Sequence, residues 1–398
     1  MTERLSLAQA AEKAGVDPSH FARLQELGIV PEGRDTFTEG DVRRALTARS
    51  LEAAGIPLDV LGDALRRGTV DLNFLDSAAY ERFVGLCDET FQQVSDRTGV
   101  PVDLLMVIRE SIGMAQPSPS DRMREDELGV LPFLELQIAA GFRPAAIERL
   151  LRVTGDATRR ISEQEAAWWR SEVIEPAMAA GHGAEDIANP EFSDKIVPLT
   201  ERALMSIYHA QQAREWTANI IGGFEQLLAK AGIQSRLERP PAICFLDITG
   251  YTRLTQEMGD DAAAELAATV ARLVQRNSVQ HGGKPIKWLG DGVMFYFDHP
   301  GPGVRAALEM ADAIPAAGLP PVHVGMSSGP VLFQEGDYFG QTVNLSSRIA
   351  DYARPGEVLV TRSVAEASDE DGIGFREIGP VDLKGVAGSV ELLLAQQS

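Results

Sequence analysis

The spacing of apolar residues changes near Gln234, and this change limits the chain to folds with two kinds of domain. Before it, apolar residues recur three and four positions apart with few β-branched runs, which indicates helix after helix. After it, β-type runs alternate with helical patterns such as that over 262–278. The β-type runs cover 242–248, 286–290, 293–297, 322–329 and 357–361. We therefore predict a multi-domain protein with an all-α N-terminal region and an α+β C-terminal domain.

The segment SRLERPP, residues 235–241, carries charge and two prolines, which is typical of a short connector. It places the C-terminal domain at 240–398. We predict a helix from about Pro198 to Lys230 ahead of it, so that 198–239 form a transmitter helix and linker. An alternative is that its apolar stripe is ordinary core. The stripe consists of Trp216, Ile220, Phe224, Leu227 and Leu228, with Gly222 and Gly223 inside the helix as possible points of bending.

Composition excludes some classes of function. The chain has 37 Lys and Arg against 58 Asp and Glu, a formal net charge of −21, which disfavours general binding to nucleic acid or to anionic membranes. Its N-terminus lacks an apolar signal-peptide core, and no apolar run approaches the roughly 18 residues that span a bilayer. Cys87 and Cys244 are far apart, and Cys244 lies in an apolar run, so we expect free buried thiols. These features predict a cytoplasmic protein.

The run AICFLDITGYT ends a predicted strand at Asp247 and continues through Thr249 and Gly250 into a helix-forming stretch. A carboxylate beside a glycine turn that opens a helix suits a divalent cation with a phosphate, because backbone N–H groups face the phosphate oxygens. Tyr251 and Thr252 supply the next such groups. An Asp in this place is also a common N-cap or turn residue, so this motif alone leaves both interpretations open.

Two further runs carry polar residues at telling positions. In KPIKWLGDGVMFYF, Asp291 lies between two β-type runs, where D-G predicts a hairpin turn. Beside Asp247, its carboxylate would complete the pair that two-metal phosphoryl chemistry needs. In DYFGQTVNLSSRIADYA, Asn344 and Arg348 lie four apart on one face of a predicted helix. They form either a surface pair or, over a nucleotide, a contact to ribose and to the transferring phosphoryl group.

Taken in order, these motifs resemble the class III nucleotide cyclases over roughly the last 160 residues. FLDITGYT, with Tyr251 in place of the more usual Phe, is similar to the first metal motif of that family. IKWLGDG is similar to the second and places Lys287 four residues before Asp291. DYFGQTVNLSSR is similar to the third, with Asp337 seven residues before Asn344. The fold implied is the α+β, ferredoxin-like βαββαβ arrangement of the cyclase catalytic domain.

The resemblance also implies roles. Asp247, Asp291 and the Ile248 carbonyl would bind two Mg²⁺ or Mn²⁺ ions per site. Lys287 and Asp337 would read the base, because an ammonium donates to an adenine ring nitrogen and a carboxylate accepts from its amino group. Guanine presents the opposite pattern, so this pair implies ATP rather than GTP.

Two further roles and an assembly are implied. Asn344 would orient the ribose, Arg348 would stabilise the transition state, and Lys384, in DLKGVAG, could touch the terminal phosphates. The reaction is an in-line attack of the ribose 3′-oxygen on the α-phosphorus with release of pyrophosphate. In this family the metal carboxylates and the other groups of one site come from different catalytic domains. One chain here carries both sets, which implies a head-to-tail homodimer with two composite sites.

The first 65 or so residues resemble the helix-turn-helix segment of MerR-type regulators, which predicts a module over 1–70. Those 70 residues hold 9 Lys and Arg against 11 Asp and Glu, and the second helix sets Arg23 against Glu26. We therefore expect packing or signal sensing rather than DNA binding. A weak duplication relates Leu51–Arg67 to Gln137–Val153, although two unrelated helical hairpins would give the same pattern.

Residues 71–197 are predicted to form a helical regulatory domain. Regulatory halves of related bacterial cyclases respond to pH or to lipophilic molecules, so a small ligand, lipid or proton, is expected here. His182 and His209 are candidate proton sensors, and the alternative is that they are ordinary surface or core residues. The main prediction is thus an adenylate cyclase. Its alternatives are a transcription regulator whose cyclase-like domain senses nucleotide, and a guanylate cyclase, which Lys287 and Asp337 disfavour.

Overall fold

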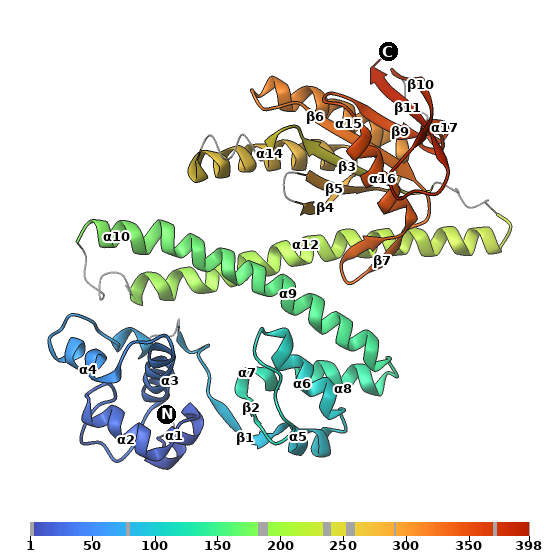
Figure 1. Ribbon diagram of the computed structural model, residues 1–398. Coiled ribbons are helices and arrows are strands. Elements are labelled where there is room, and N and C mark those ends of the chain that lie inside the picture. The colour runs from blue at the N-terminus through green and yellow to red at the C-terminus, as the bar shows by residue number, and fades with distance from the viewer. Residues whose placement is uncertain are drawn as a thin grey trace. The chain divides into compact units, whose positions relative to one another are not determined.

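The computed structural model describes residues 4–76, 80–181, 190–233, 240–251, 259–289, 292–368 and 372–397 (Figure 1). The chain divides into two compact units, Met1–Ile221 and Gly222–Ser398. The first is helical apart from two short strands, and the second contains a large mixed sheet. Within the described residues, none of the helices combines the length and the apolar character needed to cross a bilayer.

The N-terminal module is built of short capped helices. These are α1 (Leu7–Ala14), α2 (Pro18–Glu26), α3 (Glu39–Ala53), α4 (Leu58–Arg66) and the 3₁₀ turn η1 (Asn73–Asp76). Ser6 begins α1 with a capping box, and Gly15 ends it at φ 65°, where glycine is favoured. Phe21, Leu24 and Phe37 are fully buried between these helices.

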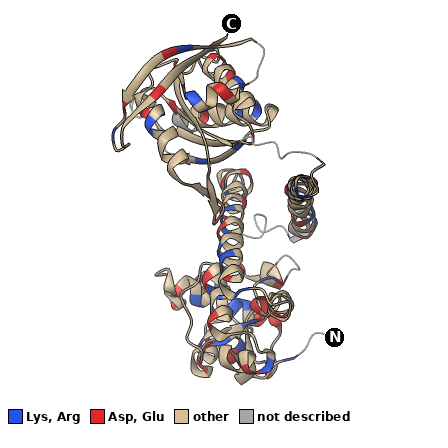
Figure 2. Ribbon diagram, turned by 90° about the vertical axis from the view of Figure 1, so that its right-hand side faces the viewer, with Lys and Arg blue, Asp and Glu red and all other residues tan. Residues whose placement is uncertain are grey.

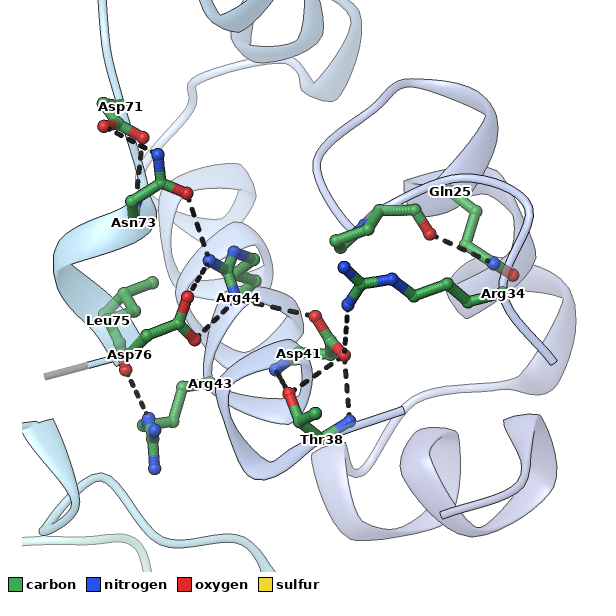
Figure 3. Close-up of polar contacts among 11 residues, drawn as sticks. Gln25, Arg34, Thr38, Asp41, Arg43, Arg44, Asp71, Asn73, Leu75 and Asp76 are labelled. Carbon is green, nitrogen blue, oxygen red and sulfur yellow. Dashed lines mark hydrogen bonds and ion pairs between the residues drawn. The ribbon is translucent and has the colours of Figure 1, made fainter. Parts of the chain in front are cut away.

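A polar network joins the start of α3 to η1 (Figure 3). Asp41 is 1% exposed and accepts hydrogen bonds from the backbone and the hydroxyl of Thr38. Arg44 donates to both carboxylate oxygens of Asp76, at 2.9 and 2.5 Å, and Arg43 donates to the Leu75 carbonyl. The two cations of the D-V-R-R run are therefore buried and used to hold this module together.

A second group of elements follows along the first unit. It contains β1 (Leu86–Thr90), α5 (Phe91–Thr98), α6 (Val102–Ser111), β2 (Arg122–Arg124), α7 (Glu125–Leu128) and α8 (Leu131–Ala139). The antiparallel pair β1–β2 was not predicted, so the N-terminal region is helical but not all-α. Arg109 forms a buried bidentate pair with Glu127 and lies over the Phe91 ring.

Long helices follow, and the last of them runs across the boundary between the two units. The helix α9 (Pro144–Trp169) continues through the π-helical turn η3 (Arg170–Ile174) into α10 (Glu175–Ala179), and α12 spans Pro190–Lys230. The predicted transmitter helix therefore begins eight residues earlier than expected. The helix begins at Pro190, and Pro198, the predicted first residue, lies inside it.

The second unit has a seven-stranded sheet in the order β10-β11-β9-β6-β3-β5-β4. Neighbours are antiparallel except β6 and β9, so the sheet is mixed. From Ala242 on, the first six elements that the structure describes run β-α-β-β-α-β along the chain. They are β3 (Ala242–Ile248), α14 (Asp260–Gln280), β4 (Lys284–Leu289), β5 (Gly292–Phe297), α15 (Pro300–Ala316) and β6 (Val322–Ser328).

The remaining elements extend this core. They are the hairpin β7 (Leu332–Gln334) and β8 (Asp337–Phe339), α16 (Gln341–Tyr352), β9 (Val358–Thr361), α17 (Arg362–Ala367), β10 (Ile373–Asp382) and β11 (Ser389–Gln397). All five predicted β-type runs are strands. The hairpins β7–β8 and β10–β11 were not foreseen.

The two faces of the sheet carry different layers. Cys244 and Leu246 of β3 pack with α14, α15 and α17, whereas Ile243 points to the other face and packs with Val343 of α16. Figure 1 shows α16 apart from α14 and α15 across the sheet.

Both cysteines are free, as predicted. Cys87 is half-buried. Burial raises the pKa of the Cys244 thiol far above its usual value, so that thiol is unreactive.

Candidate active site

Asp247 lies near the carboxyl end of β3 on the α16 face of the sheet. Alternation along β3 puts Ala242, Cys244, Leu246 and Ile248 into the apolar core and leaves Asp247 on the opposite face, with its side chain 39% exposed. A partly exposed carboxylate beside a backbone carbonyl supplies the oxygen donors that Mg²⁺ and Mn²⁺ prefer. The residues present therefore fit a divalent cation.

Gly292 leaves room for this carboxylate. It is the cross-strand partner of both Asp247 and Leu289, so β5 starts directly beside Asp247. A Cβ on Gly292 would lie 3.2 Å from Asp247 Oδ1. The second predicted metal ligand, Asp291, and the predicted phosphate contact Thr252 lie outside the described residues. Gly250, at φ 70°, and Tyr251 follow β3 in the expected turn.

His323 contacts Asp247, which the sequence analysis missed. It is the partner of Asp247 on β6, and its Nε2 lies 3.4 Å from Asp247 Oδ2. Its Nδ1 is 3.4 Å from the Thr249 hydroxyl. The sequence signal was the alternation of side chains in the β-type run VHVGM. A histidine in such a strand points to the same face of the sheet as the residue paired with it on the neighbouring strand.

The structure brings Lys287 and Asp337 together, although 50 residues separate them. The Lys287 ammonium donates to Asp337 Oδ2, and Asp337 Oδ1 accepts from the Tyr338 N–H at 2.8 Å. Lys287 and Phe245 both pair with Met294, so Lys287 shares the sheet face of Asp247. The Lys287 ammonium also lies 5.9 Å from the centroid of the Phe339 ring.

The hairpin β7–β8 holds Asp337 in place. Its two-residue turn has positive φ at Glu335 (54°) and at Gly336 (78°), the conformation that joins twisted antiparallel strands tightly. Tyr338 stacks on Tyr296 of β5 with centroids 4.5 Å apart and planes 16° apart. This stack anchors the hairpin to the sheet beside Lys287.

Asn344 and Arg348 are both exposed on α16, one turn apart, as predicted. The Arg348 guanidinium pairs with Asp351 at 2.8 Å. Among the described residues, neither side chain hydrogen-bonds to Asp247, Lys287 or Asp337. Lys384 is exposed in the β10–β11 loop, whose Leu383 packs against α16.

Comparison with known proteins assigns this domain. The family model of the adenylate and guanylate cyclase catalytic domain matches residues 233–395. The C-terminal unit therefore matches the adenylate and guanylate cyclase catalytic domain over most of its length. Among solved structures, the adenylyl cyclase CyaB from P. aeruginosa is similar to the cyclase domain at 21% identity, over 40% of this chain and 95% of that chain, with a TM-score of 0.37.

Two relatives extend beyond the cyclase domain. A pH-sensitive adenylate cyclase of Mycobacterium tuberculosis is 27% identical over 314 residues, 76% of each chain. An adenylate cyclase of Streptomyces coelicolor is 26% identical over 276 residues, covering 69% of this chain and 70% of the relative. Both alignments are longer than the match of the cyclase domain, so part of the helical half is shared as well. Together the matches support an enzyme of the adenylate cyclase type.

Replacing Gly292 by alanine tests the place of the Asp247 carboxylate. The added carbon would meet both Asp247 Oδ1 and the Leu246 carbonyl at 3.2 Å, so the carboxylate has to shift. We expect the cyclase rate to fall about ten-fold and the Mn²⁺ concentration for half-maximal rate to rise. Unchanged rate and metal dependence, at an unchanged melting temperature, would show that this contact is unimportant.

Proposed function

We propose that this protein converts ATP to 3′,5′-cyclic AMP and pyrophosphate at two composite sites of a homodimer. The single observation that carries this is the contact between Lys287 and Asp337, on the same sheet face as Asp247. The β-α-β-β-α-β order with its antiparallel strands supports a ferredoxin-like core. Divalent ions, when bound, neutralise phosphate charge and lower the pKa of the ribose 3′-hydroxyl.

The residues of the chain divide this work. Asp247, Asp291 and the Ile248 carbonyl hold two Mg²⁺ or Mn²⁺ ions, and the amides of Gly250, Tyr251 and Thr252 face the phosphates. Lys287 donates to an adenine ring nitrogen while Asp337 accepts from the amino group. Asn344 orients the ribose, Arg348 neutralises charge that develops on the α-phosphoryl group, and Lys384 reaches the terminal phosphates.

Exposure supports a site shared between protomers. Asn344 and Arg348 are exposed on α16, and within the described residues neither side chain hydrogen-bonds to Asp247 of the same chain. The surface of the same domain also exposes large apolar side chains, which a second protomer could cover. They include Trp288 (45%), Phe339 (48%) and Tyr352 (49%).

The N-terminal module is a packing or sensing unit rather than a reader of DNA. Most of its positive charges have partners within the module, and both signs of charge intermingle over the N-terminal helices (Figure 2). Lys13, Arg23, Arg34, Arg44 and Arg66 pair with carboxylates, and Arg43 and Arg49 donate to backbone carbonyls. This disfavours the alternative of a transcription regulator, because phosphate binding needs free cations.

A pocket in the first unit supports regulation by a small ligand. Its volume is about 570 Å³, within the range of ligand sites, and η3 forms part of its wall. Phe83, Trp168 and Trp169 supply apolar rings, Arg82 and Arg170 supply positive charge, and Glu165 adds one negative charge. This lining suits an amphipathic anion such as a fatty acid. The alternative regulator is the proton, because one relative is a pH-sensitive adenylate cyclase. Of the two histidines considered, His182 lies outside the described residues, and His209 is exposed on α12.

Mixing two inactive variants tests the shared site. Asp247→Ala and Arg348→Ala should each reduce cyclic AMP formation more than about a hundred-fold, because each removes a group from both sites. In a mixed dimer one site regains all its groups, so the mixture should recover up to a quarter or half of the wild-type rate. Persistent inactivity of mixtures whose subunits demonstrably exchange would refute the shared site.

Charge changes at the base-reading pair test the choice of ATP. With Lys287→Glu and Asp337→Cys combined, the pair can no longer satisfy adenine, and the preference for ATP over GTP should fall at least about ten-fold. Lys284→Glu reverses a charge on the same strand and serves as the control. An unaltered ratio of kcat/KM for the two nucleotides would remove Lys287 and Asp337 as base readers.

Dodecanoate is a suitable probe of the N-terminal pocket. It should change the tryptophan fluorescence of the full-length protein and its cyclase rate, because Trp168 and Trp169 line the pocket. Arg170→Gln should weaken this response about ten-fold by removing a charge partner for the carboxylate. Arg160→Gln, on the exposed side of α9, is the matched control. A response to pH that persists without any response to dodecanoate would favour the proton instead.

A further inference from the structure

Three hydroxyls tie α16 to the sheet on its buried side. Ser346 is 0% exposed, Ser327 of β6 is 1% exposed, and Thr342 of α16 is 7% exposed. Ser346 Oγ accepts from the Ser327 N–H at 3.1 Å, and its proton faces two carbonyls, that of Ile243 of β3 at 2.9 Å and that of Thr342 at 3.0 Å. Ser327 Oγ lies 2.7 Å from Ser346 Oγ and donates to the Thr342 carbonyl at 2.8 Å.

These bonds reach two strands at once. Ile243 and Ser327 are cross-strand partners in the β3–β6 ladder, and one hydroxyl of α16 bonds to the backbone of both. If α16 slid along its axis by about 1 Å, or turned about it by a similar displacement at the Ser346 hydroxyl, both bonds would be weakened, because hydrogen bonds weaken steeply with distance and angle. Ser346 thus fixes α16 along its axis and about it.

Packing alone does not require this hydroxyl. The helix approaches β6 so closely at Gly325 that a Cβ there would lie 2.1 Å from the Ala350 nitrogen. An alanine at position 346 would occupy almost the same space as the serine and has the higher helix propensity. Burying a hydroxyl is favourable only where its hydrogen bonds are satisfied, as they are here.

The geometry points to Ser346, supported by Ser327, as the positioning residue for Asn344 and Arg348. Ser346 lies two residues from each of them and faces the sheet, whereas they face outward. We infer that it sets the height and rotation at which both side chains meet the nucleotide. This inference rests on the proposed cyclase function and adds a residue that touches neither substrate nor metal.

Steady-state kinetics of full-length variants give the first test. Ser346→Ala should lower kcat about ten-fold and change KM for ATP less than about two-fold, because a misplaced Arg348 is felt mainly in the transition state. Ser327→Ala, which leaves the bond to Ile243, should have a smaller effect in the same direction. Ser347→Ala, one residue along the same helix and outside the cluster, should leave both constants unchanged.

Placement in mixed dimers gives the second test. The recovered site of an Asp247→Ala and Arg348→Ala mixture uses α16 from the Asp247→Ala chain. Adding Ser346→Ala to that chain should reduce the recovered rate about ten-fold. Adding it to the Arg348→Ala chain should leave the recovered rate unchanged, although the dimer then holds the same three substitutions.

The outcomes separate the two proposals. Ser346 would only stabilise the fold if Ser346→Ala lowered the recovered rate equally in both chains of the mixed dimer. The same conclusion would follow if it changed KM and lowered the melting temperature while kcat stayed the same. An inactive wild-type protein would contradict the cyclase function itself. If the starting mixture fails to recover while wild type is active, the shared site is wrong, and the division between kcat and KM in the homodimers still decides the role of Ser346.

Discussion

The pairing of β3 on both edges is the constraint on which the cyclase domain depends. β5 and β6 hydrogen-bond to β3 over its whole length, so no residue of β3 can turn over without breaking two ladders. Cys244, Leu246 and Ile248 then have to face α14 and α15, and Asp247 has to share the other face with Ile243 and Phe245. The same ladders bring Gly292 and His323 beside Asp247. The position of the Asp247 carboxylate thus follows from the alternation of side chains along β3.

A second constraint is the short distance between α16 and the sheet. Gly325 permits it, and the buried hydroxyls of Ser327 and Ser346 use it. The polar groups in this layer are satisfied by one another, which gives a defined geometry that apolar packing alone leaves loose. The helix therefore presents Asn344 and Arg348 from a rigid support. Such rigidity matters because electrostatic stabilisation of a transition state requires groups that are already in place.

Much of the cyclase domain could be predicted because its signals are local. Alternating apolar residues marked β3 to β6, and the spacing within three motifs marked Lys287, Asp337 and Asn344. The contact of His323 with Asp247 and the bond from Ser346 to Ile243 could not be predicted, since they join residues 76 and 103 positions apart. Ser346 looked like an ordinary helix residue. The strands β1 and β2 were missed for the same reason, because short strands exist only through their partners.

The division of the site over the surface has a consequence for control. In the proposed site, Asp247 and Lys287 share one face of the sheet, and Asn344 and Arg348 lie exposed on α16. A site completed by a second chain is formed only as often as the two domains meet in the right orientation. A change of about 1.4 kcal/mol in the free energy of that encounter alters the active fraction up to ten-fold. A regulatory half therefore need not touch any catalytic residue, because biasing the encounter between the cyclase domains is enough.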